Sequence, residues 1–223
     1  MTHMTKMHPR WMLLSTFLLL AAGIGTSQGA DLTGRVVAPA GSGPAVVFLQ
    51  GTTEGTLPEV DTVMTHRSDG TFDPAVAIGF VGNDFVFRNE DDQLHTTHLY
   101  LHLAYQEKIS SRPIKNGATV YNIALPLEGM EVRRLIKPYH QFTEQTGFID
   151  VRCNPHPEES ASILVFDHPY AAVTAEDGAF SIPDVPAGTH DVWVWHAGTA
   201  SHWRSVDVSA SGATQITIEV AAP

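Results

Sequence analysis

The chain has 223 residues and a formal net charge of −11, because 24 acidic side chains outnumber 13 basic ones. A chain this acidic lacks the phosphate-neutralising surface that nucleic-acid binding requires, so we expect no nucleic-acid partner. The charge instead favours a partner protein with a basic docking surface, or it simply keeps the chain soluble.

Residues 1–29 have the pattern of a secretory signal peptide. Lys6 and Arg10 precede the apolar run Trp11–Ile24, and the small residues Ser27 and Gly29 follow it. The run is shorter than the roughly 20 residues that a membrane-spanning helix needs. An uncleaved N-terminal anchor is the alternative. We expect cleavage near residue 29, a periplasmic or secreted protein, and no membrane span after cleavage. The mature chain would keep 11 basic and 24 acidic side chains, a net charge of −13.

The remaining sequence is typical of an all-β protein. Short runs of β-branched and aromatic residues recur between Gly, Pro, Asp and Asn residues, and helical periodicity is nearly absent. In Val192–His196 tryptophans and valines alternate, as they do on a strand with two distinct faces. The polar stretch Glu107–Gly117 predicts a long loop, and Glu128–Gln141 predicts one helical turn. The expected strands are Leu32–Val37, Ala45–Leu49, Thr62–His66, Val76–Phe80, Phe85–Arg88, His98–Leu103, Thr119–Leu125, Phe148–Arg152, Ser162–Phe166, Ala171–Thr174, Ala179–Ile182, His190–Trp195, Arg204–Val208 and Thr214–Val220.

Cys153 is the one cysteine of the sequence, so it cannot form an internal disulfide. In an exported protein a single cysteine is a buried side chain, an intermolecular link or a metal ligand. His156 follows it in the short, proline-flanked loop Asn154–Pro157, and His95 lies upstream beyond a polar turn. One thiolate and two imidazoles form the protein ligand set of mononuclear copper sites that transfer electrons. The pattern therefore predicts a copper site.

The fourth ligand position is unusual. Three residues after His156, where a soft methionine would be expected, the chain has Glu159. A carboxylate is a hard, anionic donor that favours the divalent ion and lowers the reduction potential. It could also open the coordination sphere to water or a small molecule. The alternative is a solvated acidic loop, because Glu158 is the immediate neighbour of Glu159. Met64 or Met130 could then supply a thioether through folding.

From about Met64 to His196 the chain resembles the plastocyanin-like cupredoxins, in particular the exported group labelled methylamine utilization proteins. The resemblance implies a Greek-key β-sandwich that binds one copper ion through His95, Cys153 and His156. Two positions depart from the group: Glu159 replaces the axial methionine, and Thr96 stands where an asparagine usually braces the ligand loop. The matching positions are Gly82, Phe87, Asn89, Asp91, His95, Cys153, His156, Pro157, Asp167–Thr174, Asp177, Gly178, Trp195 and His196.

A second β-sandwich is expected next to the first. Residues Val173–Trp195 resemble the regulatory-like β-sandwich found beside carboxypeptidases, with a boundary near His168. Two segments near the N-terminus, Gly34–Val37 and Pro44–Leu49, resemble the beginning of that module. We therefore expect N-terminal strands in 30–51 that could belong to the second sandwich, a cupredoxin-like domain over 52–168, and the rest of a discontinuous second sandwich over 169–223.

Other histidines offer weaker alternatives. His98 and His102 would share one strand face while His95 lies on the other, so a second metal site there is one option. His196 and His202 are expected to lie on the second sandwich.

The sequence thus predicts an exported copper protein with ligands His95, Cys153, His156 and Glu159 that transfers single electrons and is not an enzyme. Two alternatives stay open: an open-site copper protein that binds or transforms a small molecule, and a metal-free sandwich that binds a carbohydrate or a protein.

Overall fold

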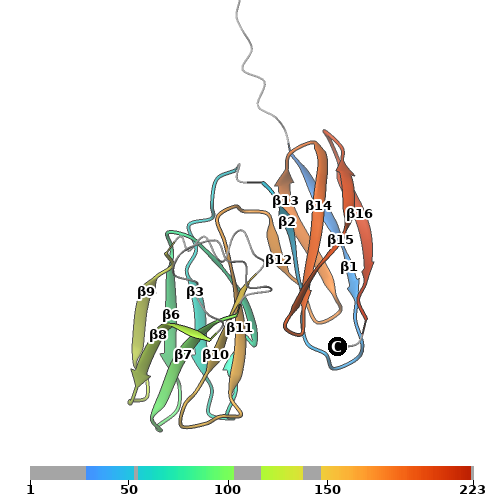
Figure 1. Cartoon of the computed structure of the whole chain (residues 1–223). Helices are drawn as coiled ribbons and strands as arrows, with labels where there is room; N and C mark the ends of the chain where they lie inside the picture. Colours follow the sequence, from blue (N-terminus) through green and yellow to red (C-terminus); the bar gives the residue numbers. More distant parts are fainter. Residues whose placement is uncertain (1–28, 53–54, 103–116, 138–146, 222–223) are drawn as a thin grey trace, which may run out of the picture.

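The computed structural model describes residues 29–52, 55–102, 117–137 and 147–221, and every regular element in these ranges is a β-strand. Figure 1 shows the strands gathered into two bodies that lie side by side. The expected all-β class and the pair of sandwiches are confirmed. Among the described residues no helix has the length and apolarity to cross a membrane. The expected signal peptide, apart from Gly29, and the expected loop Glu107–Gly117, apart from Gly117, lie outside the described residues.

The first sandwich has a four-stranded sheet, ordered β4-β3-β6-β9, and a five-stranded sheet, ordered β5-β11-β10-β7-β8. Its core combines Met64 and Phe87 from the first sheet with Leu99, Val151 and Ile163 from the second, so the two sheets pack face to face. The strands are β3 (Thr62–His66), β4 (Phe72–Asp73), β5 (Val76–Phe80), β6 (Asp84–Asn89), β7 (His95–His102), β8 (Ala118–Leu125), β9 (Glu131–Leu135), β10 (Phe148–Arg152) and β11 (Ser160–Phe166).

Alternation along β7 carries the first histidine into this core. His95, Thr97, Leu99 and Leu101 are buried, whereas the residues between them are half-buried or exposed. This is the period-2 pattern of a strand with one face on the core. His98 and His102 therefore face away from His95, as expected. Strand β7 begins at His95, three residues before the expected start at His98.

The second sandwich combines both ends of the described chain. Strand β1 (Ala30–Val37) pairs antiparallel with β13 and parallel with β16, and β2 (Val46–Gln50) pairs antiparallel with β12 and β14. The two sheets are ordered β13-β1-β16 and β12-β2-β14-β15 and share one apolar core. The N-terminal strands thus belong to the second sandwich, while the exact domain boundaries stay a prediction. Its other strands are β12 (Ala171–Val173), β13 (Ala179–Val185), β14 (Gly188–His196), β15 (Thr199–Val208) and β16 (Ala213–Glu219).

A third apolar cluster joins the two sandwiches. Phe48 and Trp195 of the second sandwich pack with Phe148 and Phe166 of the first. The ring centroids of Phe48 and Phe166 lie 5.2 Å apart, and those of Phe148 and Trp195 lie 5.4 Å apart. Aromatic contacts of this kind bury a large apolar area, so they hold the two bodies against each other.

The helical turn expected within Glu128–Gln141 is wrong for its described part, because Glu131–Leu135 forms the edge strand β9. Its sequence is polar, but the strand is held by cross-strand charge pairs. Glu131 lies opposite Arg88 in the register and accepts a hydrogen bond of 2.8 Å from its Nε. Charged residues are typical of edge strands because they discourage pairing with other chains. The short strand β4 was also not expected.

Candidate metal centre

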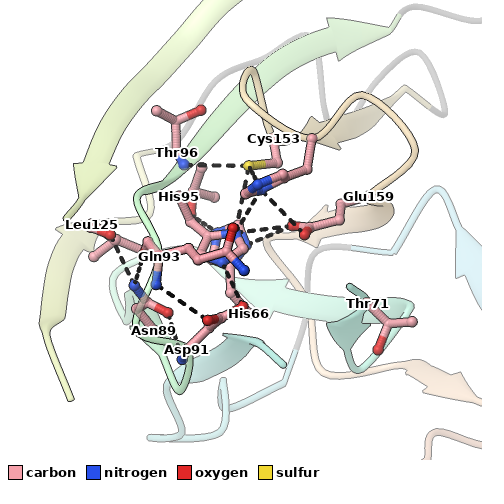
Figure 2. A network of polar contacts seen from close by, with 12 residues as sticks. His66, Thr71, Asn89, Asp91, Gln93, His95, Thr96, Leu125, Cys153 and Glu159 are labelled. Carbon is pink, nitrogen blue, oxygen red and sulfur yellow. Dashed lines mark hydrogen bonds and ion pairs between the residues drawn. The ribbon is translucent and has the colours of Figure 1, made fainter. Parts of the chain in front are cut away.

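Three of the four predicted ligands, His95, Cys153 and Glu159, point toward one another in Figure 2. The fourth, His156, has its Nδ1 3.2 Å from His95 Nδ1. Strands β10 and β7 are antiparallel, with Arg152 opposite His98, so the end of β10 and the start of β7 lie side by side. His95 begins β7, and Cys153 directly follows β10. His156 and Glu159 lie in the short connection from β10 to β11, residues 153–159, which we call the ligand loop. The sheet register therefore brings together side chains that are some sixty residues apart in the sequence.

The donor atoms of these four residues have the spacing of a metal coordination sphere. His95 Nδ1 lies 3.2 Å from His156 Nδ1 and 3.2 Å from Glu159 Oε2, and Glu159 Oε1 lies 3.4 Å from His156 Nδ1. Cys153 Sγ lies 3.6 Å from His95 Nδ1 and 3.5 Å from His156 Nδ1. Metal–ligand bonds of about 2.1–2.3 Å in a tetrahedral site require donor–donor separations of about 3.4–3.8 Å. The observed separations are close to this range.

Glu159 is part of this group because the ligand loop folds back on itself. The Glu159 amide donates to the carbonyl of His156 at 3.0 Å, and the Cys153 amide donates to the carbonyl of Glu159 at 3.4 Å. The side chain of Glu159 is only 2% exposed, whereas its neighbour Glu158 is exposed. The solvated-loop alternative therefore describes Glu158 and not Glu159.

The carboxylate of Asp91 orients His95 through the ring nitrogen that faces away from the other donors. His95 Nε2 lies 3.3 Å from Asp91 Oδ2, which leaves Nδ1 free to face the other donors. Asp91 is held in turn, because its amide donates to Asn89 Oδ1 and its Oδ1 accepts from the Gln93 amide. Burial alone would raise the pKa of Asp91, but hydrogen bonds, first among them that of His95, lower it. A carboxylate–histidine pair of this kind fixes the tautomer and the ring orientation of a ligating histidine.

The position of Cys153 is set by backbone and hydroxyl groups of the neighbouring strand. The Thr96 amide donates to Cys153 Sγ at 3.4 Å, and Thr96 Oγ1 accepts a hydrogen bond of 2.8 Å from the Asn154 amide. Thr96 thus braces the ligand loop, although it replaces the asparagine expected there. Burial raises the pKa of the Cys153 thiol. Without a metal the group is therefore a thiol at neutral pH, and a bound cation would displace its proton.

The sequence interpretation missed one residue of this centre, His66. It ends β3 and belongs, with His95, Cys153 and Glu159, to a set of buried side chains whose ligand atoms lie within 4.8 Å of one another. His66 Nδ1 lies 3.0 Å from Glu159 Oε2, and Nε2 lies 3.0 Å from Thr97 Oγ1. The strand Thr62–His66 was expected with these bounds, and its alternation places His66 on the same face as the buried Met64. That pattern was the available signal.

The remaining candidates lie elsewhere. His98 has hydrogen-bond partners on both ring nitrogens: Nε2 pairs with Thr119 Oγ1 at 2.8 Å, and Nδ1 with the Tyr100 hydroxyl at 2.7 Å. The ring of His102 packs on Phe148. His196 and His202 lie on β14 and β15 of the second sandwich, as expected. Met64 is fully buried in the core of the first sandwich, and Met130 packs against that core.

The donor set restricts the metals that this centre could hold. A thiolate and imidazoles suit copper, zinc and iron, and the carboxylate adds a hard donor that favours a divalent ion. Thiolate and carboxylate together carry two negative charges, which balance one divalent cation in a buried site. The residues therefore fit a single divalent transition-metal ion.

Comparison with known proteins gives partial similarities. Residues 165–216, less than half of the chain, match the family model of polysaccharide lyase family 4, domain II. This segment overlaps the one for which a carboxypeptidase-regulatory-like sandwich was expected. No curated protein matches the chain.

Among solved structures, an oxidized amicyanin mutant is similar at 12% identity, covering 49% of this chain and 86% of amicyanin, with a TM-score of 0.34. A Cu(I) form of another amicyanin mutant gives 13% identity over the same shares of the two chains, with a TM-score of 0.34. A purple cupredoxin from Nitrosopumilus maritimus gives 12% identity over 47% of this chain and 99% of the cupredoxin, with a TM-score of 0.29. Each similarity is confined to about half of this chain.

Proposed function

We propose that the protein binds one copper ion through His95, Cys153, His156 and Glu159 and transfers single electrons. The observation that supports this most is the convergence of one thiolate, two imidazoles and one carboxylate at separations of 3.2–3.6 Å. Copper(II) forms the most stable complexes of the divalent first-row metals with such donors. Bound copper would supply the change between Cu(II) and Cu(I). A reducing partner would supply the electron, and an oxidising partner would remove it.

The protein groups around the ion would minimise rearrangement during this change. Cys153 and Glu159 are 1% and 2% exposed, and each is held by hydrogen bonds to the backbone or to other buried side chains. The two anionic donors would make the Cu(II) state neutral and the Cu(I) state singly negative. Because a buried site favours the state with less net charge, we expect a low reduction potential compared with a site that has a neutral axial ligand.

Electrons would enter through His156. Its side chain is 24% exposed, whereas the side chains of His95 and Glu159 are at most 2% exposed. The exposed imidazole edge is therefore the ligand surface that a partner can approach. The acidic chain favours a partner with a basic docking surface, and residues 1–29 favour export to the periplasm or beyond.

The open-site alternative gains less support. A site that binds a small molecule needs a ligand position in contact with solvent, and Glu159, the residue proposed to open it, is buried and hydrogen-bonded to His66. We therefore favour electron transfer over catalysis at copper.

Titration of the metal-free protein with Cu(II) tests the proposal. We expect one ion per chain, an intense thiolate-to-copper charge-transfer absorption, and its reversible loss on one-electron reduction. Cys153→Ser removes the thiolate and should abolish the band. If the wild type and Cys153→Ser both lack this absorption, the copper site is refuted and the metal-free sandwich remains.

A further inference from the structure

His66 lies behind Glu159 and has no place in the proposed ligand set. Its side chain is fully buried, and its ring centroid lies 4.5 Å from that of His95. It touches the centre through Glu159, at 3.0 Å between Nδ1 and Oε2, and its other nitrogen lies 3.0 Å from Thr97 Oγ1. Phe72 packs on the same ring at a centroid distance of 4.2 Å. The ring is thus held on two sides, with one nitrogen directed at the carboxylate.

The chemistry of these contacts defines the tautomer. A neutral imidazole has one N–H donor and one acceptor nitrogen. A carboxylate can only accept, so the proton of His66 must lie on Nδ1 and point at Glu159. The Thr97 hydroxyl can donate, so it satisfies the acceptor Nε2.

We propose that His66 is a positioning residue for the metal centre: through the Nδ1–H bond it holds Glu159 as a ligand that gives the metal one oxygen. The inference rests on the proposed function, because it assumes that Glu159 binds the metal. One lone pair of Oε2 is used by His66, which disfavours binding through both carboxylate oxygens. Thr97 supports the arrangement by fixing the tautomer of His66. The chain Thr97–His66–Glu159 therefore does for the carboxylate what Asp91 does for His95.

Substitutions at His66 can separate this role from simple packing. His66→Phe keeps an aromatic ring and removes the donor, whereas His66→Asn loses the ring but keeps an amide N–H near the position of Nδ1. Loss of an outer-shell partner typically weakens metal binding about 10- to 100-fold. We expect that loss for His66→Phe, together with a shifted charge-transfer band, and recovery of most of the affinity and of the wild-type band in His66→Asn. A structural role would rank the two variants by packing and favour Phe.

A double-mutant cycle supplies the decisive comparison. In a Glu159→Gln background, His66→Phe should change the Cu(II) affinity by less than about threefold, because the two residues act through one contact. Independent effects that multiply would overturn the proposal, and so would a His66→Phe protein with wild-type affinity and band position. Loss of one nitrogen hyperfine coupling from the Cu(II) electron paramagnetic resonance spectrum of His66→Phe would show that His66 is itself a ligand, which also overturns it.

The contact between His66 and Glu159 can also be tested in the metal-free protein, where the result does not depend on copper binding. Long-range ¹H–¹⁵N NMR of the imidazole side chains reports the tautomer of each histidine. We expect a proton on Nδ1 of His66 in the wild type. A proton on Nε2 would overturn the positioning role even if copper binds as proposed. A proton on Nδ1 in a chain that fails to bind copper would instead leave the contact standing and refute the copper function.

Discussion

Glu159→Gln tests the role of the carboxylate most directly, because it removes one negative charge and keeps the shape of the side chain. The side chain is buried, so solvent cannot replace the lost charge, and its oxygens lie at donor spacing from both ligand imidazoles. The change makes the Cu(II) form one unit more positive and therefore stabilises Cu(I) relative to Cu(II). The reduction potential should rise.

The size of the rise follows from the geometry. A unit charge about 2.1 Å from the metal at an effective dielectric constant of about 20 contributes about 8 kcal/mol. For a one-electron couple this is an upper limit of about 0.3 V. The amide oxygen of glutamine retains a dipole that offsets part of the loss, so we expect a rise of about 0.1–0.3 V. Spectroelectrochemical titration of the charge-transfer band measures it.

Glu158→Gln is the matched control. It makes the same change of charge one residue away, but Glu158 is exposed, and solvent screens its charge. If Glu159→Gln shifts the potential no more than Glu158→Gln does, or lowers it, Glu159 is not a ligand and the charge argument fails.

Four further predictions test the site and the fold. Asp91→Asn should weaken Cu(II) binding about 10- to 100-fold in a chelator competition, because His95 loses the carboxylate that fixes its tautomer. Cu(II) binding at pH 7 should release about one proton, measured by calorimetry in buffers of different ionisation enthalpy, and Cys153→Ser should abolish this release, since burial keeps the Cys153 thiol protonated. Burial lowers the pKa of His168, so in mild acid the unfolded chain takes up a proton that the folded chain does not. The free energy of unfolding should therefore fall as the pH drops below about 6.5. The urea midpoint of His168→Asn should change less between pH 7 and pH 5 than that of the wild type. Gly178→Ala should lower the urea midpoint more than Gly212→Ala does. Both glycines have a positive φ, which costs a non-glycine residue about 1–2 kcal/mol. A Cβ at Gly178 would also lie 2.2 Å from the Val36 carbonyl oxygen, whereas a Cβ at Gly212 would have no neighbour within 4 Å.

Strand positions were predictable from the sequence where one face is apolar. Thr62–His66, Val76–Phe80 and Phe148–Arg152 have the expected bounds because each packs apolar side chains into the core of the first sandwich or onto the apolar cluster between the two sandwiches. Strand β9 escaped prediction because its stability depends on pairing. Glu131 pairs with Arg88 of β6, and Arg133 pairs with Asp84 of the same strand. Such charge pairs join residues far apart in the sequence, so a local sequence pattern does not predict them.

The sequence by itself determined the all-β class and named His95, Cys153, His156 and Glu159 as candidate ligands, because residue types, their order and the short spacing from cysteine to histidine are local properties. Tertiary structure decided the rest. Glu159 points inward because the ligand loop folds back, while its equally acidic neighbour Glu158 faces solvent. His66 contacts Glu159, 93 residues away in the sequence, because the last residue of β3 and the ligand loop lie at the same end of the first sandwich. Such contacts depend on how sheets pack, and packing is a property of the whole chain.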